Sequence, residues 1–197
     1  MILIDKFVCN FGESRSAIEQ KIQAVCNNLN IDPTWLMLVM WQESRLNSKA
    51  VNAQKGDPAD AFTRAKTRAT GLIQFMPNTA AGLGTSNQAL FNMNAIQQLD
   101  YVQRYYQPYK ARIHNFHDLY LATFFPVAMG KPDDFVLQTA TLSAKKISDQ
   151  NPGMDLNKDG RITVGEFREI ITQRVPVAFR DLIKKKKLSS EQESLLS

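Results

Sequence analysis

The chain has 197 residues, of which 44% are hydrophobic and 22% are charged. This composition is typical of a globular domain and argues against a disordered or membrane-embedded chain. The length predicts one domain with a sizeable core. The formal net charge of +5 favours anionic partners, such as nucleic acid, an anionic membrane surface or an anionic cell wall.

Several classes of segment are missing from the sequence. No stretch approaches the roughly 18 apolar residues of a membrane helix, and residues 1–6 do not begin a signal peptide. Cys9 and Cys26 are too few for a disulfide framework, so free thiols are expected, although one disulfide would be compatible with a location outside the cytoplasm. The four lysines at 184–187 are interpreted as a solvated basic tail, whose role stays open.

Apolar residues recur at helical spacing along most of the chain, and few segments alternate as strands do. The sequence therefore predicts an all-α fold with long loops. The first helix begins at Ser14 or Ser16, and the second begins at Asp32, which can cap it, followed by Pro33 in the first turn. Further helices are expected at residues 78–83, 94–110, 118–128, 135–147 and 167–182, and a largely irregular loop is expected at 46–70.

The second helix carries a carboxylate where the apolar pattern asks for a core residue. Leu36, Val39, Met40 and Glu43 fall on one face of this helix. Burial disfavours the charged form of a carboxyl group and so raises its pKa. A carboxyl group that keeps its proton at neutral pH can act as a general acid. The alternative is that Glu43 lies at a fraying helix end and simply reaches water.

Residues 155–166 match the twelve-residue loop of a calcium-binding EF-hand. Gly160 stands at position six, where the loop turns sharply, and Ile162 is the apolar anchor at position eight. The six oxygen ligands would be the side chains of five residues and one backbone carbonyl, from Asp155, Asn157, Asp159, Arg161 (carbonyl), Thr163 and Glu166. Because the chain has no second such loop, a structural Ca²⁺ site is expected rather than a sensor. The alternative is a turn that keeps the shape without the ion.

Two other side chains have metal-like spacing. His114 and His117 are three residues apart, but no carboxylate motif accompanies them, so they are interpreted as surface histidines.

Two stretches together resemble the soluble lytic transglycosylase family, which is similar in fold to goose-type lysozymes. The first is Glu43-Ser44, and the second is Gly-Leu-Ile-Gln-Phe-Met-Pro at 71–77. The resemblance extends over residues 30–140. Residues 99–109, 118–120 and 130–134 are similar to the phage and tail-associated branch of the family, which the later Asn-Pro-Gly and calcium loop also fit.

The resemblance implies one lysozyme-like catalytic domain over residues 1–197. Its core would span about residues 16–148, followed by the calcium loop and a closing helix at 149–183 and a basic, polar tail at 184–197. Glu43 would be the catalytic residue. Substrate contacts would come from the two motifs and a later helix, namely Ser44, Gln74, Phe75, Met76, Tyr120 and Phe124.

The third motif of the family departs from its usual form. Ala-Tyr-Asn should fall near residues 122–125, where Phe124 and Phe125 replace the tyrosine and the asparagine. The resemblance implies that a tyrosine contacts the catalytic glutamate, and Tyr120, one helical turn earlier, is expected to supply this hydroxyl group.

The implied substrate is the glycan strand of peptidoglycan, and Tyr105 and Tyr106 are candidates for stacking on its sugar rings. Glu43 would protonate the oxygen of the MurNAc-GlcNAc bond and then, as a base, take the proton of the sugar's 6-hydroxyl group, which closes a 1,6-anhydro ring with assistance from the N-acetyl group. No cofactor is needed for this chemistry. Action at the bacterial cell wall or periplasm is implied, with a phage tail or the lysis machinery as the expected partner in delivery.

Three alternatives stay open. A lysozyme-type hydrolase would usually need a second carboxylate, and Asp57 or Asp60 in the long loop would be nearest in sequence, although turn roles are favoured for both. A catalytically dead, calcium-stabilised wall-binding module is the second alternative. Nucleic-acid binding ranks last, because no segment resembles a base-reading recognition helix.

Overall fold

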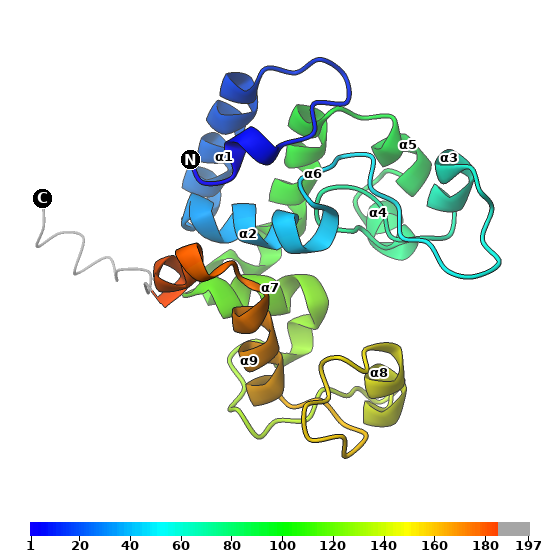
Figure 1. The fold of residues 1–197 in the computed structure, drawn as a ribbon, viewed down its shortest axis with the longest axis vertical. Coiled ribbons are helices and arrows are strands. Elements are labelled where there is room, and N and C mark those ends of the chain that lie inside the picture. Colours follow the sequence, from blue (N-terminus) through cyan, green and yellow to red (C-terminus); the bar gives the residue numbers. More distant parts are fainter. Residues whose placement is uncertain (185–197) are drawn as a thin grey trace, which may run out of the picture. The chain divides into compact units, whose positions relative to one another are not determined.

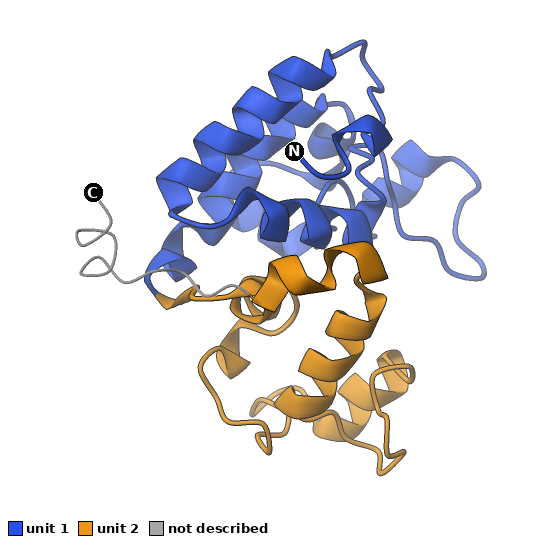
Figure 2. Ribbon diagram, turned by 60° about the vertical axis from the view of Figure 1, so that its left-hand side comes forward, with its two compact units in different colours: residues 1–111 blue, residues 112–197 orange. Residues whose placement is uncertain are grey.

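The computed structural model describes residues 1–184, and this part of the chain is mainly helical (Figure 1). Its β-structure is limited to isolated bridges, so the prediction of an all-α fold is confirmed. The chain divides into two compact units, residues 1–111 and 112–197 (Figure 2). The assignment of the whole chain to one catalytic domain stays a prediction. Residues 185–197, which hold most of the expected basic tail, lie outside the described residues.

The first unit is built from helices of very different lengths. Their bounds are η1 (Ile4–Lys6), α1 (Arg15–Leu29), α2 (Pro33–Ser44), α3 (Ala61–Ala65), α4 (Pro77–Gly82), α5 (Asn87–Phe91) and α6 (Ala95–Tyr106), followed by η2 (Gln107–Arg112). Cys9 and Cys26 in this unit are free thiols. No helix within residues 1–184 is both long enough and apolar enough to cross a membrane.

The starts of α1 and α2 are set by short polar side chains, as the sequence predicts. The Ser14 side chain accepts a hydrogen bond from the Ala17 N–H, and the Asp32 side chain accepts one from the Thr34 N–H. Every residue from 35 to 40 in α2 is buried, so this part of the helix is apolar on all sides. Arg45 ends α2 in the left-handed conformation at φ 55°.

The helix α6 packs along α1 and is fixed at its start. Asn94 and Gln97 form a capping box, and Glu13 accepts a hydrogen bond from the Ala95 N–H at 2.8 Å. In α6 the apolar Ile96 is only half-buried, whereas the polar Gln98 is fully buried. The expected helix over 94–110 ends at Tyr106, and Pro108 lies in η2.

The 46–70 loop is more structured than the sequence indicates. It contains α3, which the Asp60 side chain caps. The short α5, capped by Ser86, was also not predicted. Both helices have five residues, too few for an apolar period to show.

The second unit contains α7 (Phe116–Phe124), η3 (Pro126–Ala128), α8 (Ala144–Gln150), α9 (Val164–Arg174) and η4 (Val177–Lys184) within its described residues. The expected helix at 118–128 ends at Phe124 because Pro126 follows. The expected helix at 167–182 starts three residues earlier, at a capping box of Thr163 and Glu166, and stops before Pro176.

The helix predicted at 135–147 is wrong. Val136 instead forms an antiparallel bridge with Thr163, in which Leu137 N–H donates to Ile162 and Val164 N–H donates to Phe135. These two bonds hold residues 135–137 in an extended conformation, which is incompatible with a helix over 135–147. The helix α8 begins only at Ala144, where the Ser143 side chain caps it.

The two histidines have different environments, and only His114 is a surface residue as expected. His117 Nε2 lies 2.8 Å from Thr172 Oγ1, which donates its own proton to the Arg168 carbonyl. The hydroxyl therefore accepts from His117. Burial lowers the pKa of His117 and the nearby Arg168 lowers it further, while Asp118 and Asp133 act in the opposite direction.

We predict that His117 makes the protein less stable in mild acid. Because its pKa is lower in the folded chain, the unfolded chain binds the proton first as the pH falls. The contribution of neutral His117 to the free energy of unfolding is therefore full above pH 6.5. It is lost as the pH falls through 6.5 towards the lowered pKa. Melting temperatures between neutral and acidic pH should fall less steeply for His117→Gln than for the wild type. His114→Gln is the control, and equal slopes in all three proteins would contradict the prediction.

Candidate active site

The end of α2 is bonded to the glycine turn that follows 28 residues later. Ser44 Oγ lies 2.9 Å from the Leu72 carbonyl oxygen and 3.0 Å from that of Met40, so its hydroxyl can donate to either. Ser44 is buried, and Glu43 immediately before it is half-buried. The two sequence motifs, Glu43-Ser44 and residues 71–77, are therefore in direct contact in the folded chain.

The turn itself is closed by paired backbone hydrogen bonds. Thr70 and Phe75 exchange N–H···O bonds of 3.0 and 2.9 Å. Gly71 and Gln74 both have positive φ, 82° and 51°. Gln74 Nε2 donates to the carbonyl oxygens of Gly71, at 3.0 Å, and Ala50, at 3.3 Å. The amide nitrogen of this expected substrate residue thus stabilises its own turn.

Gln98 of α6 holds the turn from the other side, a contact that the sequence analysis missed. Its Oε1 accepts from the Leu72 N–H at 3.0 Å, and its Nε2 donates to the carbonyl oxygens of Ser48 and Leu90 at 2.6 and 2.7 Å. The side chain is fully buried. One signal was available in the sequence, because Gln98 lies at helical spacing among the apolar positions of its helix.

Aromatic side chains lie beside the turn in the first unit. The rings of Phe75 and Tyr105 meet edge to face with centroids 6.1 Å apart. Burial raises the pKa of Tyr105, and the nearby Tyr109 and Glu43 raise it further, which places Tyr105 within the electrostatic field of Glu43. Tyr106 is fully buried, so the idea that it stacks on a sugar is wrong. Met76 is 57% exposed at the start of α4.

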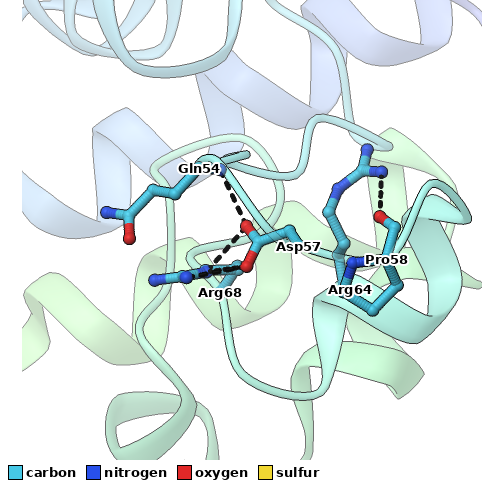
Figure 3. A network of polar contacts seen from close by, with 5 residues as sticks. All are labelled: Gln54, Asp57, Pro58, Arg64 and Arg68. Carbon is cyan, nitrogen blue, oxygen red and sulfur yellow. Dashed lines mark hydrogen bonds and ion pairs between the residues drawn. The ribbon is translucent and has the colours of Figure 1, made fainter.

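Asp57 has a local structural role in the long loop (Figure 3), and so does Asp60. Asp57 receives Arg68 Nε and Nη2 in a bidentate ion pair and also the Gln54 N–H at 2.7 Å. The hydrogen bonds from Arg68 lower the pKa of Asp57. Asp60 accepts from the Thr63 N–H at the start of α3. Arg64 donates to the Pro58 carbonyl at 2.8 Å, which closes the same loop.

Tyr120 and Phe124 belong to the second unit. They lie on α7 and contact the ring of Phe167 of α9, with centroid distances of 5.8 Å for Tyr120 and 5.4 Å for the stacked Phe124. Tyr120 is 3% exposed. Their contact with substrate, and the hydroxyl role of Tyr120 towards Glu43, stay predictions.

The first unit thus places a carboxylate at the end of a buried helix and bonds a glycine turn to that helix end. Residues 20–112 match the family described as Transglycosylase SLT domain. The match includes Glu43, Ser44 and the whole turn, and it ends within one residue of the boundary between the two units. It supports peptidoglycan as the substrate and a lytic transglycosylase as the class of enzyme. No curated protein matches the chain.

The loop at 155–166 makes a tight turn. Lys158 and Gly160 have φ of 59° and 82°. Asp155 accepts backbone N–H groups at 3.2 and 3.0 Å from Asp159 and Gly160, and Ser148 Oγ donates to it at 2.8 Å. The bond from Ser148 lowers the pKa of Asp155, so this carboxylate stays ionised.

The donor set of this loop consists of oxygen atoms, which suits a hard cation such as Ca²⁺. Glu166 Oε2 accepts from the Thr163 N–H at 2.9 Å, and its Oε1 accepts from the Leu156 N–H at 3.1 Å. Within residues 1–184, no three His, Cys, Asp or Glu side chains gather closely enough to hold a metal ion. The carboxylates of the loop are therefore turned towards its backbone, and an ion would have to draw them together.

We predict that Gly71 tolerates no side chain. A Cβ atom there would lie 2.5 Å from Gln98 Oε1, and its φ of 82° is unfavourable for other residues. Gly71→Ala should lower the free energy of unfolding by about 2–5 kcal/mol, the sum of a left-handed backbone and an overpacked contact. Urea denaturation measures this loss.

Gly84 provides a matched control, because its φ is 75° but a Cβ atom would meet nothing within 4 Å. Gly84→Ala should cost only the backbone term, about 1–2 kcal/mol. Equal losses for the two variants would show that the contact with Gln98 is unimportant.

Proposed function

We propose that this protein is a peptidoglycan lytic transglycosylase in which Glu43 acts alone, first as acid and then as base. The observation that carries the proposal is the hydrogen bond from Ser44 to the Leu72 carbonyl, which joins the helix end bearing Glu43 to the glycine turn inside the matched family segment. We also propose action at the bacterial cell wall, delivered by a phage tail or the lysis machinery, as the resemblance to the phage branch implies.

The proposed reaction needs one carboxyl group near the glycosidic oxygen. Protonated Glu43 donates to the oxygen of the MurNAc-GlcNAc bond as that bond breaks, and the substrate's N-acetyl group stabilises the positive charge at the sugar's anomeric carbon. Glu43, now ionised, removes the proton of the 6-hydroxyl group, whose oxygen attacks the anomeric carbon and closes the 1,6-anhydro ring. Among the expected substrate residues of the two motifs, Met76 is exposed and Gln74 is half-buried, so these two would contact the glycan. Ser44 and Phe75 are buried and would support the site from behind.

A hydrolase on the same fold is the second candidate, and a dead wall-binding module is the third. An inverting hydrolase positions its water with a second carboxylate. Asp57 is poorly suited to this role, because both of its oxygens already accept hydrogen bonds from Arg68. The dead module stays open because Phe124 and Phe125 replace the usual tyrosine and asparagine.

We predict that Glu43→Gln abolishes the release of soluble products from purified peptidoglycan, because the amide can neither donate the proton nor take it back. Mass spectrometry of the wild-type products should show 1,6-anhydro ends. Reducing ends would instead indicate a hydrolase. Asp57→Asn is the control and should retain the product type, although the loop loses its ion pair with Arg68. Equally negligible release by wild type and Glu43→Gln would refute the enzyme proposal.

A structural Ca²⁺ ion at residues 155–166 is the second part of the proposal. Its ligands would be side-chain oxygens of five residues and one backbone carbonyl, from Asp155, Asn157, Asp159, Arg161 (carbonyl), Thr163 and Glu166. The antiparallel bridge between Val136 and Thr163 supports this Ca²⁺ site. It pairs the single loop with an extended segment of the chain, as a second EF-hand loop would otherwise do. The Asp133 carboxylate forms an ion pair with Arg168, and the Asp133 backbone carbonyl accepts a hydrogen bond from the Gly165 N–H at 2.9 Å.

We predict that Ca²⁺ raises the melting temperature of the full chain and that a chelator reverses the change. Ligand that binds only the folded state at a hundred times its dissociation constant adds about 2.7 kcal/mol of stability. Asp159→Ala should lose the response, because it removes one proposed ligand. Asp149→Ala, which removes only an exposed pair with Lys145, should keep it. A wild type that melts identically with Ca²⁺ and with chelator would contradict the site.

A further inference from the structure

We propose that Gln98 is a positioning residue for the catalytic carboxylate and acts through the backbone of Leu72. The inference rests on the proposed function of Glu43 and adds a residue that neither sequence motif contains. Gln98 would not touch the substrate. It would set the place of the helix end that carries Glu43.

The first link is the double attachment of Leu72. Its N–H donates to Gln98 Oε1 at 3.0 Å, and its carbonyl oxygen accepts from Ser44 Oγ at 2.9 Å. A single residue of the turn is thus held by α6 on one side and by the last residue of α2 on the other. Since Ser44 directly follows Glu43, a shift of Leu72 is transmitted to the helix end that carries the proposed acid.

A second link runs through the segment that leaves α2. Gln98 Nε2 donates to the Ser48 carbonyl at 2.6 Å, four residues beyond Ser44, and to the Leu90 carbonyl at 2.7 Å. One side chain therefore holds the turn, the exit of α2 and the end of α5. These segments are distant in sequence, and Gln98 is fully buried where they meet.

The chemistry of this position requires an amide. The three backbone groups present one N–H and two carbonyl oxygens, and glutamine offers one acceptor oxygen and two N–H donors to match them. Glutamate would lack the donors, lysine would lack the acceptor, and methionine would lack both. If the position only filled the core, an apolar side chain would do so without burying a polar group, which costs free energy unless every bond is made.

Gly71 supports this assignment from the opposite side of the contact. A Cβ atom at residue 71 would lie 2.5 Å from Gln98 Oε1, so the glycine leaves the space in which the amide reaches the Leu72 N–H. The glycine of the second motif and Gln98 therefore form one contact. Catalytic groups must be held close to their productive geometry, and a displacement of about 1 Å can lower the rate about a hundredfold.

The test compares Gln98→Met with a variant that destabilises the same unit elsewhere. Methionine keeps the size of the side chain and removes all three hydrogen bonds. Val25→Ala is the control, because Val25 is buried in α1 and bonds to no part of the turn. Both are assayed on peptidoglycan well below their melting temperatures, with kcat and KM measured separately.

The expected result is a fall in kcat of about 10- to 100-fold for Gln98→Met, with KM within about twofold of the wild type, because geometry and not substrate contact is lost. Val25→Ala should keep kcat after correction for the folded fraction. Equal kcat in the two variants would overturn the inference. So would a loss confined to KM.

A measurement on the wild type alone tests the contact without activity or variants. Hydrogen exchange followed by NMR should place the Leu72 amide among the most slowly exchanging amides of the first unit, since its partner is fully buried. Exchange as fast as that of exposed loop amides would overturn the inference, even in an active protein. A wild type that releases no product, but protects Leu72, would refute the proposed function and leave this contact standing.

Discussion

The backbone of Leu72 makes two hydrogen bonds on which the arrangement of the first unit depends. Its N–H and carbonyl groups are buried, and a buried backbone group left without a partner costs about 1–3 kcal/mol. The partners come from Gln98 and Ser44, which lie 54 residues apart in the sequence. The glycine turn therefore cannot move independently of α2 or α6. The two motifs, each weak alone, are joined by this shared backbone into one site.

Backbone hydrogen bonds also fix the long loop before the turn. Gly71 N–H donates to the Ala50 carbonyl and Asn52 N–H donates to that of Ala69, so the two ends of the loop are bonded to each other. Between them, Asp57 and Arg68 close a smaller loop with a bidentate pair (Figure 3). The loop is thus a folded insertion with its own ion pair. Its carboxylates Asp57 and Asp60 both accept hydrogen bonds from within the loop.

Local signals explain what the sequence could predict. Ser14, Asp32 and Pro33 act within one turn of their own helices, so the starts of α1 and α2 were readable. The failure at 135–147 has a non-local cause, because residues 135–137 are held extended by bonds to residues 162–164. Gln98 was missed for a similar reason. A polar residue in a helix suggests solvent, and only the folded chain brings three backbone groups to it.

The face of α6 that carries Gln98 also carries a tyrosine beside the glycine turn. Tyr105 lies seven residues, or about two helical turns, after Gln98 on this face, and its ring contacts Phe75 of the turn. Burial raises the pKa of Tyr105, and Tyr109 and Glu43 raise it further, so its hydroxyl stays protonated throughout the physiological range. Tyr120, to which the resemblance gives the hydroxyl role towards Glu43, lies on α7 of the second unit with its ring packed against Phe167, and that role stays a prediction. One face of α6 thus supplies both the amide that fixes the turn and an aromatic ring packed against the turn.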